Sequence, residues 1–357
     1  MSDTDVKDLY TKFAARKFLA IFSVFIVLLI AVVVSVSLGA GSPRFTEAMN
    51  VIGSRLFPFL NIAPEPEITQ IIILDVRLPR IILAIVAGAG LAASGATMQG
   101  VLRNPLVSSY ILGISAAAGF GAALAILFGA SLFTPIGGYL VVFNAFVFSL
   151  LAMFLVYGIA RLRSVTSETI ILAGVAIGYL FSAMLSLIQY IAPEYEALRA
   201  VVFWLMGGLG QAKWESIVLI IPIVAVTIIL MAKKSWDLNV MSLGEEVATS
   251  VGVNSKRVLS VCMVLATLAT ASIIAFTGII GFICLISPHI SRMIIGSDHR
   301  FLIPCSVLVG ALLLLCSDTA ARLILAPTEL PVGIVTSLLG VPFFIYILLN
   351  KRRQSWR

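Results

Sequence analysis

Charge is scarce in this sequence. Acidic and basic residues together make up 11% of the 357 positions, whereas 60% are hydrophobic and the mean hydropathy is +1.10. A soluble domain has about 25% charged residues, so this chain has too few polar side chains to cover a globule in water. The apolar runs are long enough for spanning helices rather than for barrel strands. The sequence therefore predicts an all-α, polytopic membrane protein.

Catalytic and nucleotide-binding motifs are absent. The sequence has no GxxxxGK[ST] loop, and no glycine is followed by lysine, so the chain has no P-loop to cradle nucleotide phosphates. HExxH and GxSxG do not occur either. His289 and His299 lie in separate contexts, which favours helix-end roles over a metal site. These absences indicate a chain that is not an enzyme, and a membrane enzyme is the weakest hypothesis.

Cysteine is infrequent and unpaired in the sequence. The four cysteines lie inside apolar runs without any CxxC spacing: Cys262, Cys284, Cys305 and Cys316. This pattern suggests neither a disulfide framework nor a zinc site, and we expect small buried side chains and no bound cofactor. The net charge of +7 comes from short basic clusters between apolar runs, so it points to a lipid bilayer as partner and not to nucleic acid.

One stretch organises the chain, from Leu74 to Ser115. It opens with charged residues around Pro79, continues as about twenty apolar and small residues, which is enough to cross a bilayer, and closes on Asn104-Pro105. Small residues recur at four-residue spacing at Gly88, Ala92 and Ala96. In lipid, such spacing marks a face where another helix packs closely. A tightly packed spanning helix is the simplest interpretation of this pattern.

The other apolar runs bring the expected total to ten spanning helices within residues 18–350. The long run that begins at Val258 should break at Thr277-Gly278 and Gly281 into two helices, the second containing Pro288. The remaining helices are expected at 18–38, 71–100, 110–128, 139–160, 168–191, 215–232, 302–322 and 331–350. The connections 39–70 and 192–214 are expected to be polar or mixed links. Residues 1–17 and 351–357 are expected to be polar end segments.

The distribution of lysine and arginine predicts the orientation. With the N-terminus inside, 17 of the 24 basic residues fall on the inner side and 7 on the outer side. Cytoplasmic loops of membrane proteins carry the excess of basic residues. We therefore expect a multi-pass membrane protein with both termini in the cytoplasm.

Asp318 is the main intramembrane acid. It precedes Arg322 by four residues near the outer end of its helix, so an ion pair within one helix turn is the economical interpretation. An ion-coupled carrier would place an acid or a broken helix near the bilayer midplane. The position of Asp318 weakens the hypothesis of a secondary transporter, which remains the alternative.

The polar segment 233–257 contains a short helix-like stretch, LGEEVATSVGVN at 243–254. Glu245 and Glu246 would lie in the first turn, where the helix dipole favours acids, and Gly252 can end the helix. This segment could dock a soluble partner on the cytoplasmic face, or it could be a solvated linker.

Several motifs together resemble the FecCD family, the permease subunits of prokaryotic ATP-binding-cassette importers for ferric siderophores, haem and cobalamin. They cover almost the whole chain after the first helix, in the order of the family. The matching stretches are RLPR at 77–80, GATMQGVLRNPLVSSYILGIS at 95–115, LAGVAIG at 172–178, FWLMGGL at 203–209, LGEEVATSVGVN at 243–254, GIIGFICLISPHISRMIIGSDHR at 278–300, DTAAR at 318–322, and the ELPVGIVTSLLGVPFFIYILL region at 329–349.

The resemblance implies a type II importer permease of a prokaryotic plasma or inner membrane, which forms a homodimer with the path for the cargo at its interface. It implies two cytoplasmic ATPase subunits, which use ATP and magnesium, and an extracytoplasmic binding protein that delivers the chelate. Cys284 and Ser287 depart from residues that are frequent in the family.

The resemblance also implies roles for individual residues. Docking of acidic groups on the binding protein falls to Arg77, Arg80 and Arg322. The cytoplasmic gate is assigned to Asn104, Leu106, Thr166 and Ser167. Coupling to the ATPase is assigned to Leu243, Gly244, Glu245, Glu246 and Gly252.

Overall fold

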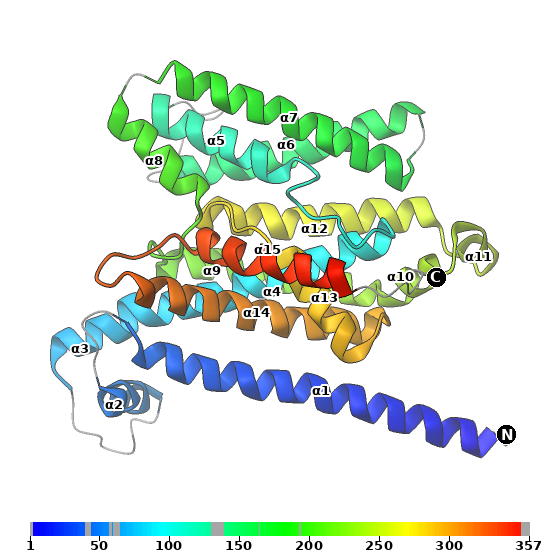
Figure 1. The fold of residues 1–357 in the computed structure, drawn as a ribbon, viewed down its shortest axis with the longest axis horizontal. Helices are drawn as coiled ribbons and strands as arrows, with labels where there is room; N and C mark the ends of the chain where they lie inside the picture. Colours follow the sequence, from blue (N-terminus) through cyan, green and yellow to red (C-terminus); the bar gives the residue numbers. More distant parts are fainter. Residues whose placement is uncertain are drawn as a thin grey trace.

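The computed structural model describes residues 3–39, 44–56, 59, 65–129, 139–163, 165–192 and 194–350. Several expected features lie outside these ranges: Pro43, Pro58, Pro64, the turn around Pro135, Pro193 and the tail 351–357. Within the described ranges the regular structure is helical throughout (Figure 1). The all-α class predicted from the hydropathy is confirmed.

Ten helices of the described chain match the predicted spans. Six meet the length and apolarity needed to cross a membrane, and three shorter apolar helices accompany them. The helix α4 adds 24 residues, or about 36 Å at 1.5 Å per residue. The ten are α1 (Asp3–Ser37), α4 (Leu78–Val101), α5 (Ile114–Phe128), α6 (Leu140–Arg163), α7 (Ser167–Tyr190), α9 (Trp214–Lys233), α12 (Ser255–Thr277), α13 (Ile283–Ile295), α14 (His299–Ile324) and α15 (Val332–Asn350).

The helix α4 is the centre of the bundle, and it packs against α9, α12, α13 and α14. A Cβ atom at Gly88 would overlap the backbone of Gly310 on α14, and a Cβ atom at Gly310 would overlap Ala92. A Cβ at Gly95 would overlap the carbonyl of Cys284 on α13. The small-residue face predicted from the spacing is therefore a face of close helix packing.

The predicted break between α12 and α13 is confirmed at Gly278. Its φ of +67° lies in a region that side chains disfavour, and a Cβ there would overlap the carbonyl oxygen of Trp204. Phe282 then begins α13 with a φ of +66°. Glycine at the break thus permits both the turn and the close approach of the end of α8 (Tyr195–Leu205).

The two connections differ from the sequence expectation because each contains short helices. The first holds α2 (Phe45–Leu56) and most of α3 (Glu67–Ile71), whereas the π-helical turn η2 (Ile72–Arg77) falls within the helix expected at 71–100 and runs directly into α4. The second holds α8 (Tyr195–Leu205). In α2, Ala48 and Val51 are buried while the opposite side is more open, so the helix is amphipathic and too short to give a long apolar run.

The molecule has two distinct ends (Figure 1). At one end, which we call the α11 end, α1 begins and α15 finishes beside α10 (Ser235–Ser242) and α11 (Glu245–Ser250). At the other, the α2 end, α2 and α3 lie beside the finish of α1. The polar segment 233–257 is therefore on the same end as the start of α1, as the topology predicts.

Candidate functional site

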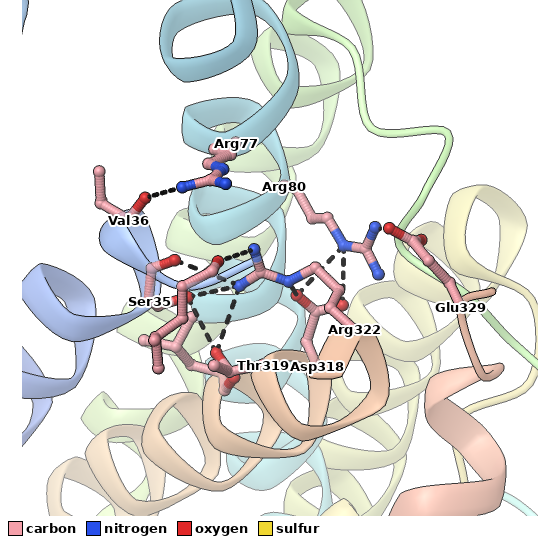
Figure 2. A network of polar contacts seen from close by, with 10 residues as sticks. Ser35, Val36, Arg77, Arg80, Asp318, Thr319, Arg322 and Glu329 are labelled. Carbon is pink, nitrogen blue, oxygen red and sulfur yellow. Dashed lines mark hydrogen bonds and ion pairs between the residues drawn. The ribbon is translucent and has the colours of Figure 1, made fainter. Parts of the chain in front are cut away.

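A buried polar network occupies the α2 end of the bundle (Figure 2). Its centre is Asp318 on α14, whose side chain has no exposed surface. Arg80 on α4 donates through Nε to both carboxylate oxygens, at 2.9 and 3.1 Å. Arg322, one turn further along α14, brings its Nε within 3.2 Å of Asp318 Oδ2. The ion pair expected between Asp318 and Arg322 is present, and a second arginine shares the acid.

Arg80 links three elements through its second acidic partner. Its Nη1 lies 2.6 Å from Oε2 of Glu329, which precedes α15. The side chain of Glu329 is about half exposed, whereas those of Arg80 and Asp318 are buried. A single guanidinium therefore joins α4, α14 and the segment that leads into α15, and Glu329 is the edge of the network that solvent reaches.

The other two arginines bind the end of α1 (Figure 2). Arg322 donates to the carbonyl oxygen of Leu38 at 3.0 Å and to Oγ of Ser35 at 2.7 Å. Arg77 donates to the carbonyl oxygen of Val36. The last carbonyl groups of a helix lack partners within the helix and carry partial negative charge. The two guanidinium groups therefore cap α1 and fasten it to α4 and α14.

The three arginines that the resemblance assigns to docking are buried in the structure. Only 3% of Arg77, 7% of Arg80 and 5% of Arg322 is exposed. The reason is tertiary: the end of α1, Asp318 and Glu329 cover and pair the charges, and those contacts join positions far apart in the sequence. The proposed docking role of these residues stays a prediction.

The four gate candidates lie at the turns of the α11 end, but they do not form one cluster. The side chain of Asn104 accepts a hydrogen bond from the backbone N–H of Leu106 at 2.9 Å, which fixes the turn after α4 and leaves Leu106 exposed. Thr166 caps α7, because its Oγ1 accepts from the N–H of Thr169 at 3.3 Å. Ser167 is the first residue of that helix.

A cavity of about 260 Å³ is lined by some of the gate candidates and by one of the coupling candidates. Thr166 and Ser167 line it together with Arg103 and with Glu245 of α11. Asn104 and Leu106 are not among its lining residues. The structure thus places two of the gate candidates against the coupling segment and leaves the other two on the neighbouring turn.

The coupling candidates form an exposed apolar and acidic surface. The expected helix is short, because Gly244 with a φ of +120° starts α11 and Gly252 with a φ of +84° follows it. Glu245 and Glu246 lie in its first turn. Leu243 is 70% exposed and Val251 is 65% exposed. An open groove runs along residues 243–250.

The sequence alone did not reveal how α10 and α11 are held. Asn239 on α10 donates to Asp298 Oδ1 at 2.7 Å and accepts from the backbone N–H of His299 at 2.8 Å. Burial raises the pKa of Asp298, but hydrogen bonds from Arg300 and Asn239 outweigh this effect and lower that pKa to about 2. The sequence feature that could have singled out Asp298 is its N-cap position, directly before α14.

A larger cavity, of about 640 Å³, opens between the turn after α4, the α12–α13 break and α15. Its walls are mainly apolar and carry hydroxyl groups and one thiol, from Ser108, Ser109, Ser115, Ser337 and Cys284. No charged side chain lines it. Sequence reasoning named none of these residues as part of a path, because uncharged small side chains carry no ligand signature.

Spanning helices with a buried polar network at one end and an exposed apolar and acidic surface at the other define a multi-pass membrane protein. The model of the FecCD transport family matches residues 27–350, and the chain belongs to this family. It is therefore a permease subunit of an ATP-binding-cassette importer. Subunits of this family are not enzymes themselves, and their membership implies ATPase and binding-protein partners.

Curated relatives cover most of the chain. The ABC transporter permease protein MJ0087 of Methanocaldococcus jannaschii is 46% identical over 80% of this chain and 83% of its own length. The hemin transport permease HmuU of Yersinia pestis is 40% identical over 79% and 84%. The molybdate import permease MolB of Haemophilus influenzae is 37% identical over 91% and 94%.

A solved structure shares the fold. It is described as a metal-chelate type ABC transporter in an inward-facing conformation, and it aligns with a TM-score of 0.79 at 34% identity. The alignment covers 92% of this chain and 98% of that one. The arrangement of α1 to α15 is thus that of a known importer permease.

Proposed function

We propose that this permease moves a metal chelate inward, of the iron–siderophore, haem or cobalamin type. The observation that carries the proposal is the uncharged cavity of about 640 Å³, whose apolar wall and scattered hydroxyl groups suit a bulky chelate with a mainly apolar surface. The hemin permease among the relatives and the metal-chelate description of the structural neighbour support it. The molybdate relative defines the competing cargo, a small oxyanion.

Two copies of the chain form the path in this proposal. The cavity opens at the side where α15 carries exposed apolar residues such as Leu338 and Leu339. A second copy across that face would enclose the cavity and give a path at a symmetric interface. The resemblance to the family supports the same homodimer.

The α11 end faces the cytoplasm in this proposal. The excess of basic residues on this side supports the orientation, and both ends of the chain would then be cytoplasmic. Two ATPase subunits would bind the exposed surface of Leu243, Gly244, Glu245 and Glu246, and they would supply ATP and magnesium. A movement of α11 would reach the gate candidates Thr166 and Ser167, because they line the same cavity as Glu245 of α11.

The binding protein would dock at the α2 end. Since Arg77 and Arg322 are enclosed by α1, an incoming acid reaches the network at Arg80, where Glu329 is the exposed partner. Long-range attraction would orient the complex more than hold it. An acidic group of the binding protein would then compete with Glu329 for Arg80.

The alternative, an ion-coupled carrier, would use Asp318 as its coupling site. Asp318 is bound by two arginines that also tie together α1, α4 and α14. This arrangement favours a structural role, since a transported ion would have to displace a guanidinium.

Association with an ATPase tests the proposed function. We expect the purified chain to bind its ABC ATPase subunit and Glu245→Arg with Glu246→Arg to abolish the complex, because two acids on the docking surface become cations. The matched control is Glu194→Arg with Glu196→Arg, which makes the same charge change at the exposed start of α8. Equal ATPase binding by both double variants would contradict the coupling assignment.

A further inference from the structure

A basic and aromatic surface lies on the start of α1, at the α11 end. Lys12 and Arg16 are exposed on successive turns of α1, and Lys17 adjoins them. Neither Lys12 nor Arg16 has an ion pair among the described residues. The sequence contains no acid between Asp8 and Glu47, so nothing in the spanning part of α1 offsets this charge.

Aromatic rings from three helices lie beside Lys17 and beside Arg300, which itself lies over the Phe301 ring at 5.7 Å. The Nζ of Lys17 lies 4.9 Å from the centroid of the Phe301 ring on α14, and the Phe18 and Phe301 rings meet edge to face with their centroids 5.4 Å apart. Arg300, held by Asp298, stacks on Trp236 of α10 at 4.4 Å. Phe18 and Trp236 each expose about 60% of their surface. Exposed aromatic rings at a helix end are typical of the membrane–water interface.

The length of α1 places this surface at headgroup level. The helix has 35 residues, about 52 Å at 1.5 Å per residue, whereas the hydrocarbon core is about 30 Å thick. Its start extends past the ends of α13 and α14 (Figure 1). The basic residues therefore emerge from the hydrocarbon where lipid phosphates lie.

We propose that Lys12, Arg16 and Lys17, beside Phe18, Phe301 and Trp236, form a binding site for the headgroup of an anionic phospholipid in the cytoplasmic leaflet. The cations would bind the phosphate, and the rings would lie at the glycerol level. Basic clusters on the cytoplasmic side of spanning helices recognise such headgroups. The site rests on the orientation in the proposed function but needs neither ATPase nor cargo. Its consequence is mechanical: a bound lipid would fasten the start of α1 to α10 and α14.

Native mass spectrometry of the full chain tests the site. The protein is titrated with phosphatidylglycerol and, separately, with phosphatidylcholine, and the lipids retained are counted. Each basic residue near a membrane surface adds about 1 kcal/mol, a factor of about five. After screening, we expect Lys12→Gln, Arg16→Gln and Lys17→Gln together to weaken phosphatidylglycerol retention at least about tenfold.

The control removes the same charge at the opposite end. Arg44→Gln, Arg55→Gln and Lys213→Gln are exposed positions beyond the spanning helices, and we expect retention within about twofold of the wild type. A variant with Lys12→Arg and Lys17→Arg should keep the lipid and exclude loss through misfolding. Equal weakening in both triple variants, or equal retention of phosphatidylcholine, would overturn the proposal. Competition by millimolar inorganic phosphate would also overturn it, because the ligand would then be the free ion.

The test is independent of transport. A chain that retains phosphatidylglycerol through Lys12, Arg16 and Lys17 but binds no ATPase would contradict the proposed function and leave the lipid site standing. The reverse result would remove the lipid site alone.

Discussion

Asp318 shows how a single residue can order the α2 end of the bundle. Its carboxylate is enclosed and bound by Arg80 and Arg322, and these arginines reach Glu329 and the end of α1. Such a network is costly to break because each charge is out of water and depends on its partners. Its stability role follows from burial, whatever further role it has in docking.

Asp318→Asn should destabilise the protein by about 3–5 kcal/mol, the usual range when one member of a buried ion pair is removed. Two guanidinium groups would keep only a neutral acceptor. Equilibrium unfolding in mixtures of mild detergent and SDS measures the change. Glu329→Gln is the control, because this half-exposed partner should cost at most about 1 kcal/mol. Similar losses for the two variants would show that Asp318 is not the centre of the network.

The lowered pKa of Asp298 predicts that the folded state loses stability at acid pH. Its folded-state pKa of about 2 is below the ordinary 3.8. A lowered carboxyl pKa stabilises the folded state above the ordinary value and loses that effect as the pH falls through the folded pKa. The difference in melting temperature between wild type and Asp298→Asn should therefore shrink from about pH 6 to about pH 2. An unchanged difference would contradict the role of this carboxylate.

Ion pairs within one helix turn can be predicted from the sequence, whereas ion pairs between distant positions cannot. Asp318 and Arg322 are four residues apart on one helix, so their contact follows from helix geometry. Arg80 lies 238 positions from Asp318, and no periodicity relates them. The burial of Arg77 and Arg322 depends on where α1 ends in space, and no pattern in the sequence reports that position.

The position of the helix α4 in the bundle depends on its many small side chains. Alanine and glycine allow α13 and α14 to approach its backbone, and a Cβ at Gly95 would overlap a carbonyl group of α13. In a membrane the packing of helices depends on such close approach, because lipid provides no hydrophobic drive for association.

Gly95→Ala should therefore separate α4 from α13 and destabilise the protein, even though alanine is the better helix former. Gly158→Ala on α6 is the matched control, since a Cβ added there would meet no atom within 4 Å and alanine should stabilise the helix by up to about 1 kcal/mol. Opposite shifts in melting temperature are expected. A stabilised Gly95→Ala would contradict the close packing of α4 and α13.

Long elements were predictable and short ones were not. The spans from α5 to α15 agree with the apolar runs because a bilayer requires about 20 apolar residues per helix. The helices α2 and α8 escaped detection because only one face of each is apolar. The short helix α11 was anticipated from Glu245, Glu246 and Gly252, whereas the anchorage of the neighbouring α10 through Asn239 depends on a tertiary contact.

In the whole molecule, the length of the bundle separates the polar network at the α2 end from the exposed surface of α11 (Figure 1). The helices α4 and α14 run from the network of Arg80 and Asp318 to the turns that adjoin α10 and α11. A signal from a docked binding protein to the ATPase would have to pass along these helices. The family resemblance assigned docking of the binding protein to one end and coupling to the ATPase to the other, whereas composition predicted only a membrane protein.

Removing the competitor at the α2 end should strengthen docking. In Glu329→Gln one negative charge leaves the surface, and Arg80 becomes more available to an acidic group of the binding protein. We expect severalfold tighter binding at low salt and a smaller gain near 1 M salt, where the screening length is about 3 Å. Surface plasmon resonance with the immobilised permease measures it. An affinity that falls, or that ignores salt, would contradict docking at Arg80.

The central claim is that this permease moves a metal chelate at the expense of ATP hydrolysed by separate subunits. Uptake into proteoliposomes containing the permease and its ATPase tests it directly, with the binding protein loaded in turn with ferric siderophore, haem, cobalamin or molybdate. We predict that one chelate is accumulated with ATP and magnesium on the ATPase side, and that an ion gradient without ATP gives no uptake. Uptake driven by a proton or sodium gradient without ATP, and abolished by Asp318→Asn, would contradict the account.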